Sequence, residues 1–175
     1  MTFQSQRRLQ SELDPEDATP VLQPERAHAA ARTAALRALG RREYSEFELR
    51  SKLERNHDLN VVEAVLEELT QEHLLSDERF AEVFVRSRIG RGQGPLRIRQ
   101  DLRQKGVEEE LIDACLTFDA DHWRELASQV LSKRSDLQRV MREQDPELRY
   151  RGQAKVGRFL ASRGFPSDII HQLLR

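Results

Sequence analysis

The sequence has a single cysteine, few aromatic residues and no long apolar run. The single cysteine and the lack of a long apolar run each exclude a class of protein. Cys115 is the one cysteine in 175 residues, so the chain has no internal disulfide and fits a reducing cytoplasm. No apolar stretch approaches the ~18 residues of a membrane span, and the N-terminus lacks the apolar segment of a secretory signal. We therefore expect a cytoplasmic protein that does not contact a membrane. Cys115 lies in an apolar helical stripe and is expected to be buried.

The sequence also lacks the residue patterns of a catalytic, metal-binding or nucleotide-binding site. The five histidines show no ligand spacing, and the acidic segment 63–72 has no histidine or cysteine partner pattern. Gly90, Gly92 and Gly94 follow no predicted strand and lack the Gly-Lys-Ser/Thr ending of a phosphate-binding loop. No segment alternates with period two for long enough to predict a strand. We therefore expect neither an enzyme nor a bound metal or cofactor.

The sequence contains a helical pattern that occurs three times, at a spacing of about fifty residues. Each copy has an apolar pair four residues apart, followed by a second apolar stripe; the pairs are Leu49/Leu53, Ile98/Leu102 and Val156/Leu160. The pattern predicts an all-α, elongated fold of three tandem three-helix modules. We place module 1 at 24–74, module 2 at 75–119 and module 3 at 120–175, after a flexible or loosely docked extension at 1–23. Such arrays present long surfaces, which favours a binding function.

Local signals predict where individual helices begin and end. Ser45 and Glu48 have the spacing of a capping box, in which each side chain bonds to the backbone of the other residue at the start of a helix. Residues 133–147 form a longer segment than their counterparts in the other modules. We expect its apolar residues to extend the preceding helix until Asp145-Pro146 breaks it; these residues are Leu137, Val140 and Met141.

The formal net charge of −1 conceals alternating blocks of charge. Residues 41–80 carry a net −5 and residues 82–105 a net +5, whereas 106–125 carry −6 and 126–175 carry +5. Blocks of this kind steer the approach of charged partners. The alternative is that oppositely charged blocks merely hold neighbouring modules together.

The candidate binding residues are the cations of the two basic blocks. Arg99 and Arg103 lie four residues apart and share a helix face, as do Arg151, Lys155 and Arg158. Such rows contact phosphates without reading sequence. An ordinary solvated face, partly paired with the acidic helix that follows, or an acidic patch on a protein partner would satisfy the same residues. The full candidate set is Arg86, Arg88, Arg91, Arg97, Arg99, Arg103, Lys105, Arg149, Arg151, Lys155 and Arg158.

One aromatic residue lies inside the second basic set. Tyr150 could stack on a nucleic-acid base or pack against the protein. Proteins that stack bases usually offer several aromatic side chains, and this region offers few. We therefore expect Tyr150 to pack.

Over about residues 30–174 the chain resembles the RecX family of recombinase regulators. The resemblance rests on three motifs: Tyr44-Ser45-x3-Glu48-Leu49-x3-Leu53, Ser76-Asp77-x-Arg79-Phe80-Ala81, and Gly94-Pro95-x2-Ile98-x3-Leu102-x2-Lys105-Gly106-Val107. Module 3 matches loosely, and the long insertion after Leu131 and the first 24 residues depart from the family pattern. The resemblance implies an elongated, curved stack of three-helix modules.

The resemblance also implies a function and partners. It implies a non-enzymatic regulator that binds the RecA recombinase filament together with single- and double-stranded DNA. Inhibition of ATP hydrolysis, strand exchange and co-protease activity would follow, within DNA repair and the SOS response. We expect such a regulator to be a monomer. The alternative function is that of a stand-alone DNA-binding helical-repeat protein with no recombinase partner.

Overall fold

The computed structural model of the chain describes residues 24–175, which form ten helices and no strand. The helices are α1 (Pro24–Leu39), α2 (Glu46–Leu53), α3 (Leu59–Gln71), α4 (Asp77–Gly90), α5 (Pro95–Arg103), α6 (Glu109–Cys115), α7 (Ala120–Ser132), α8 (Ser135–Met141), α9 (Pro146–Ser162) and α10 (Ser167–Leu174). The extension expected at residues 1–23 lies outside the described residues.

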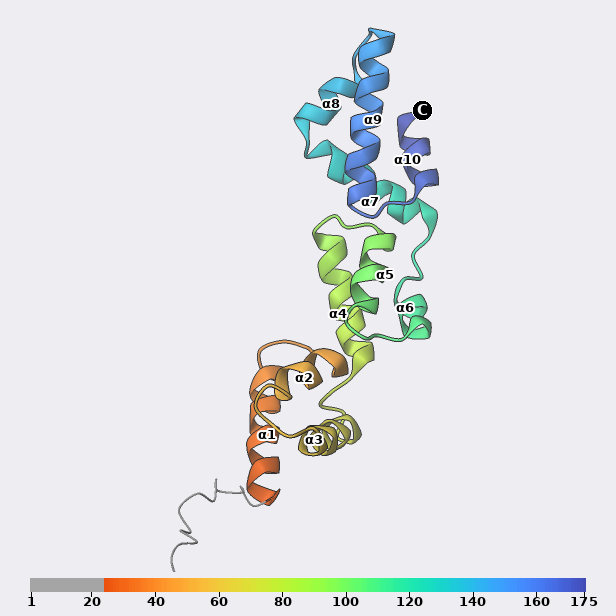
Figure 1. The fold of residues 1–175 in the computed structure, drawn as a ribbon. Coiled ribbons are helices and arrows are strands. Elements are labelled where there is room, and N and C mark those ends of the chain that lie inside the picture. The colour runs from red at the N-terminus through yellow and green to blue at the C-terminus, as the bar shows by residue number, and fades with distance from the viewer. Residues whose placement is uncertain (1–23) are drawn as a thin grey trace, which may run out of the picture.

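The helices gather in three groups that follow one another along a long axis (Figure 1). Module 1 contains α1 to α3, module 2 contains α4 to α6, and module 3 contains α7 to α10. Within the groups, α1 packs on α3, α4 packs on α6, and α9 lies between α8 and α10. The expectation of an elongated all-α array is confirmed.

Half of the capping box predicted at the start of α2 is present. The Ser45 hydroxyl accepts a hydrogen bond from the Glu48 N–H at 3.1 Å. The Glu48 carboxylate, however, does not return to the backbone of Ser45, so the second half of the prediction is wrong. It pairs with Arg42 at 2.8 Å and with Lys105 of module 2. Burial raises the pKa of Glu48, but the hydrogen bonds from Arg42 and Lys105 outweigh burial and leave that pKa below its ordinary value.

Module 3 contains a fourth helix, α8, in a segment that we expected to continue the preceding helix. The chain leaves the helical conformation after α7, because Arg134 has φ −120° and ψ 83° before α8 begins. The expectation that residues 137–141 extend the preceding helix is therefore wrong. The break lets α8 fold back against α9, where Leu137 becomes buried with 1% of its surface exposed. Continuing α7 would have carried that apolar side chain away from the core.

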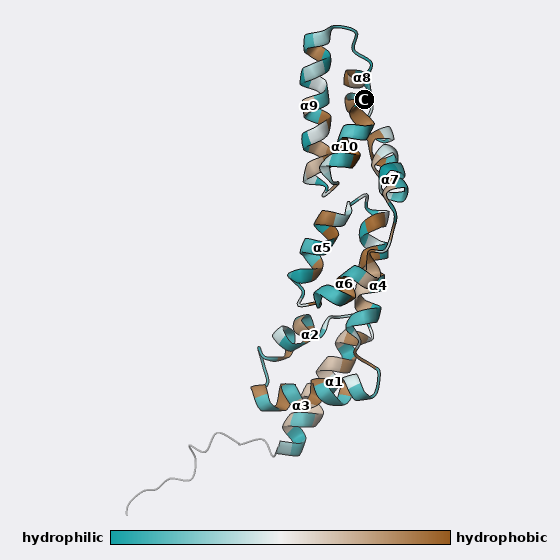
Figure 2. Cartoon of the chain, turned by 90° about the vertical axis from the view of Figure 1, so that its right-hand side faces the viewer, coloured by the Kyte–Doolittle hydropathy of each residue, from teal (hydrophilic) through white to brown (hydrophobic). Residues whose placement is uncertain are grey.

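The buried apolar residues form two separate cores. Figure 2 shows hydrophobic residues alternating with hydrophilic ones along the helices that supply these cores. Module 1 has its own, built around the alanine stripe of α1 and the apolar faces of α2 and α3. Modules 2 and 3 share one continuous core that runs from Ile98 and Leu102 to Trp123 and Leu160. Cys115 packs at the edge of this shared core and is only partly buried, so the expectation of its burial holds in part. That partial burial raises the pKa of the Cys115 thiol.

A glycine turn of module 2 docks on the start of α2 in module 1. The Ser45 hydroxyl donates to the carbonyl oxygen of Lys105 at 2.7 Å. Gly106 follows with φ +76°, and a Cβ atom there would lie 2.5 Å from the Phe47 Cβ. Only glycine allows this turn to come so close to α2.

The joint between modules 2 and 3 repeats this arrangement with different atoms. The Gly94 N–H donates to the carbonyl oxygen of Arg163 at 2.8 Å, and the Leu96 N–H donates to that of Gly164 at 3.0 Å. Gly164 has φ +86°, and a Cβ atom there would lie 2.9 Å from the Arg97 Cα. Modules 2 and 3 thus each place a glycine turn against the first turn of a helix in the preceding module, which fixes the offset between neighbours.

No third joint can form on module 3 at the corresponding position. The apolar register that aligns Leu49, Ile98 and Val156 places Gly152 opposite the helix-start residues Ser45 and Gly94. Gly152 is instead buried inside α9, where an added Cβ would lie 2.9 Å from the Val140 Cβ. The segment around α8 and the first turns of α9 therefore close the array, as terminal repeats do in other tandem folds.

Candidate protein and nucleic-acid interface

The structure separates the eleven candidate cations into two groups. The first lies on module 2, at the end of α4 and along α5, and the second lies along α9 of module 3. Every one of them is exposed or half-buried. Their position at the surface agrees with a binding role. Some of them pair with a carboxylate of the chain, and we call their charges balanced; the others have no such partner among the described residues, and we call their charges unbalanced.

Arg99 and Arg103 share a face of α5 and turn that face toward α6. Arg103 makes two hydrogen bonds to the Glu109 carboxylate, at 2.7 and 2.8 Å. Arg99 pairs with Glu109 as well and reaches Asp113 one turn further along α6. The hydrogen bonds that Arg99 donates to the carboxylates of Asp113 and Glu109 raise its pKa. The charges of both arginines are therefore balanced within module 2 before any partner arrives.

This cluster makes the stability of module 2 sensitive to acid. The hydrogen bond from Arg103, with that from Arg99, lowers the pKa of Glu109 from 4.5 to about 2. A lowered folded-state pKa means that the contribution is complete above pH ~4.5 and is lost as the pH falls toward 2. We expect Glu109→Gln to remove part of the acid destabilisation in that window, measured as the urea midpoint against pH.

The neighbouring Glu110 supplies the control for this prediction. Glu110 is exposed, and among the described residues it has no basic partner within ion-pair distance. Glu110→Gln should therefore leave the pH profile parallel to that of the parent chain. Identical profiles for the parent chain and Glu109→Gln would contradict the assignment.

Three further cations of module 2 are also paired. Arg97 lies 3.0 Å and Arg88 lies 3.8 Å from the carboxylate of Asp101 on α5. Lys105 pairs with Glu48 across the joint between modules 1 and 2. This last pair supports the alternative interpretation of the charge blocks, because it connects a positive block to the negative block before it.

Two cations of module 2 remain unbalanced. Arg86 and Arg91 are exposed, and neither has a carboxylate partner among residues 24–175. The carbonyl oxygen of Arg91 accepts a hydrogen bond from the Arg163 guanidinium at 3.0 Å, so the joint holds the end of α4 in place. Both side chains are available to an anionic partner.

The second group shows the same division. Arg151 pairs with Glu147 at 2.6 Å within α9, and Lys155 lies 3.7 Å from Asp136 of α8. Within the described part of the chain, Arg149 and Arg158 have no carboxylate partner and are exposed.

The exposure of Tyr150 contradicts our expectation that this side chain packs against the protein. Its side chain is 73% exposed, on the first turns of α9 that project beyond the module 3 core. The prediction rested on the small number of aromatic residues nearby and took no account of where this turn of α9 lies relative to the core.

Exposed apolar residues at the joints were not foreseen from the sequence. Phe47 and Leu96 are 51% and 55% exposed, and each is the second residue of the helix on which a glycine turn docks. Their matched positions in the repeat are a signal that the sequence contains. The joints therefore present an apolar side chain beside the cations Lys105 and Arg97.

The described residues contain no helix long and apolar enough to cross a bilayer. In that same stretch of chain, no group of three or more histidine, cysteine, aspartate or glutamate residues is arranged to hold a metal ion.

Comparison with known proteins identifies the family of the chain. Three family models match in chain order: the RecX first three-helix domain at residues 31–69, the second at 76–116 and the third at 125–174. The chain belongs to the RecX family. RecX family members are regulatory proteins rather than enzymes, so the cations described above are candidate binding residues.

Relatives and solved structures agree with the family models. The chain is 45% identical over 147 residues to regulatory protein RecX of Chromohalobacter salexigens, covering 83% of this chain and 91% of the relative. It is 43% identical to regulatory protein RecX of Halorhodospira halophila, covering 81% and 84%. A crystal structure of regulatory protein RecX superposes with a TM-score of 0.73 at 30% identity, covering 86% of this chain and 72% of that chain. RecX from Lactobacillus salivarius, at 21% identity and a TM-score of 0.72, shares the fold over 85% and 94%.

Proposed function

We propose that this chain binds the RecA recombinase filament and DNA and inhibits the ATPase, strand-exchange and co-protease activities of RecA. The match of three RecX domains, in order, across residues 31–174 carries the proposal. The chain acts without chemistry of its own, by occupying a surface on the filament.

The architecture supports contact with a polymer. The helix groups follow one another along a long axis (Figure 1). With module boundaries near 24–74, 75–119 and 120–175, we infer that separate modules contact separate filament subunits. Once one module is bound, binding of the next is intramolecular and adds affinity without a new diffusional encounter. The closed end of module 3 agrees with action as a monomer, because the joint has no free docking position there.

The unbalanced cations support a role for nucleic-acid phosphates. Arg86 and Arg91 on module 2 and Arg149 and Arg158 on module 3 have no carboxylate to balance them among the described residues. Single- and double-stranded DNA both offer phosphates at regular spacing, and arginine contacts to phosphates release counterions.

The test is a titration of the chain into the ATPase assay of its cognate RecA, assembled on single-stranded DNA. We expect ATP hydrolysis and strand exchange to fall as the chain approaches one copy per few filament subunits. Unchanged hydrolysis at several-fold molar excess over filament sites would overturn the proposal.

Two matched variants separate the cation contacts from general charge. One replaces Arg86, Arg91, Arg149 and Arg158 with glutamine; the other replaces four exposed arginines of module 1, which are Arg26, Arg37, Arg41 and Arg55. Both variants lose the same formal charge. We expect the first to inhibit less and to show a shallower salt dependence of DNA binding, by about 0.7 in the log–log slope for each lost contact to a single strand. Tight, salt-dependent binding to bare DNA without any effect on RecA would instead indicate a stand-alone DNA-binding protein.

A further inference from the structure

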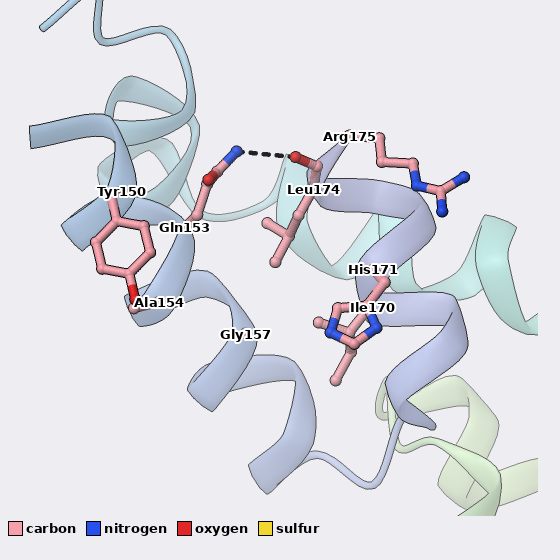
Figure 3. A pocket seen from close by; sticks show the side chains of 8 residues that line it. All are labelled: Tyr150, Gln153, Ala154, Gly157, Ile170, His171, Leu174 and Arg175. Atoms are coloured by element: carbon pink, nitrogen blue, oxygen red, sulfur yellow. Dashed lines mark hydrogen bonds between the residues drawn. The ribbon is translucent and has the colours of Figure 1, made fainter. Parts of the chain in front are cut away.

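A surface groove lies between α9 and α10 at the far end of module 3 (Figure 3). Its volume is about 530 Å³. Its lining includes Tyr150, Gln153, Ala154, His171, Leu174 and Arg175. Small side chains from α9 and aliphatic ones from α10 give it an apolar floor, and no acidic side chain lines it. The groove therefore suits a flat, largely apolar group attached to a negative charge.

Tyr150 stands at one side of this groove with an unusually exposed ring. At 73% exposure it is the most exposed of the large apolar side chains among residues 24–175, where the next, Leu59, is at 57%. A tyrosine usually buries its ring and keeps only its hydroxyl in water. Here the whole ring is presented beside the apolar floor (Figure 3), which is the arrangement that a stacking platform requires.

Gln153 supplies a polar edge of fixed orientation. Its Nε2 donates to the carbonyl oxygen of Leu174 at 2.8 Å, which ties α9 to α10 and orients the amide. Among the described residues, no donor reaches the amide oxygen of Gln153. That oxygen, together with the ring nitrogens of His171 on the opposite wall, offers hydrogen bonds to the edge of a flat polar ring.

The charge around the groove is positive. Arg149 and Arg158 lie four residues from the lining residues Gln153 and Ala154 on α9, which makes them neighbours on the helix surface. Neither arginine is balanced by a carboxylate within the described residues. Arg175 lines the groove from the α10 side. A ligand that combines a stacking ring with phosphates on either side fits this set of neighbours better than a neutral apolar peptide does.

We propose that this groove binds an unpaired base of single-stranded nucleic acid, with the base on the Tyr150 ring and the adjoining phosphates near Arg149 and Arg158. The inference deepens the proposed function, on which it rests for the presence of DNA. A base in a duplex is stacked on its neighbours and cannot enter, so the groove selects single strands. Module 3 would thereby hold the strand through its bases as well as its phosphates.

The test uses the chain alone, without RecA, so that it does not depend on the inhibition assay. The probe is a labelled oligo-dT strand carrying one 2-aminopurine, with a hairpin duplex of the same charge for comparison. We expect Tyr150→Ala to weaken single-strand binding on the order of tenfold, which corresponds to the loss of one stacked base. We also expect it to abolish the quenching of 2-aminopurine and to leave duplex binding unchanged. Tyr150→Phe should bind like the parent chain.

Leu148 provides the matched control. It is 49% exposed on the same helix and has no ring, so Leu148→Ala removes apolar surface without removing a stacking partner. Circular dichroism should show unchanged helix content in all three variants. Equal losses on single strand and duplex, an equal loss for Leu148→Ala, or no single-strand binding by the parent chain would each overturn the inference. Weaker RecA inhibition by Tyr150→Ala with unchanged DNA affinity would assign the groove to a protein partner and overturn it too, while leaving the proposed function intact.

Discussion

Replacing Gly164 with alanine is expected to lower the free energy of unfolding by about 3 kcal/mol, because it violates two constraints together. The residue adopts φ +86°, a region in which an alanine is strained. Its new Cβ would lie 2.9 Å from the Arg97 Cα, and backbone there cannot move aside as a flexible side chain could. In the same joint, the Leu96 N–H donates to the carbonyl oxygen of Gly164 at 3.0 Å. If either backbone segment shifts to make room for the Cβ, this hydrogen bond is lost as well.

Gly157 is the matched control for that experiment. It lies inside α9, and an added Cβ would meet the Ile170 Cγ2 at 3.7 Å and the Leu174 Cδ1 at 3.8 Å, which are ordinary contacts. Gly157→Ala should therefore stabilise the chain by about 0.5–1 kcal/mol, since alanine loses less backbone entropy on entering a helix. Urea unfolding followed by circular dichroism measures both changes. A loss below about 1 kcal/mol for Gly164→Ala would mean that the joint does not constrain the array.

The repeat and the positions of helices could be predicted from the sequence because they depend on residues that lie close together in the chain. Apolar pairs such as Ile98 and Leu102 recur at helical spacing, and a residue buried on one face of a helix has to follow that spacing wherever the module lies. Helix starts at Ser45 and Gly94-Pro95 were likewise readable, since capping depends on residues within one turn. The all-α array follows from such signals alone.

The sequence left open whether the basic block pairs with the acidic helix that follows, and it could not say which cations do so, because that depends on which helix faces meet. The cations of residues 82–105 form one block in the sequence, yet the structure turns Arg99 and Arg103 toward α6 and leaves Arg86 and Arg91 unbalanced. Lys105 finds Glu48 only because the turn at Gly106 docks on α2, a contact between residues 57 positions apart. A count of charges along the chain therefore overstates the cations available to a partner.

The end of the array was missed for a related reason. We expected Leu137, Val140 and Met141 to continue the preceding helix up to Asp145-Pro146. The separate helix α8 became visible only in three dimensions, where Val140 packs on Gly152 of α9. The first turns of α9, on which α8 packs, carry Tyr150 to one side of the groove, so the segment that closes the array also helps to form the groove.

Leu102→Ala is expected to lower the free energy of unfolding by about 2–5 kcal/mol. Leu102 on α5 has none of its surface exposed, so its truncation leaves a cavity in the core shared by modules 2 and 3. Leu96→Ala, on the same helix and 55% exposed, should change stability by less than about 0.5 kcal/mol. Similar losses for the two variants would mean that the α5 stripe is not the core.

The position of the one tryptophan turns this variant into a test of how the modules are coupled. Trp123 belongs to module 3 but lies in the core that Leu102 enters from module 2. Leu102→Ala should therefore shift the unfolding midpoint reported by Trp123 fluorescence. Leu53→Ala, in the separate core of module 1, should shift the midpoint seen by circular dichroism more than the one seen by Trp123. Equal Trp123 shifts for both variants would mean that all three modules unfold as one unit, in which case the polar joint at Ser45 and Lys105 couples neighbours as strongly as a shared apolar core does.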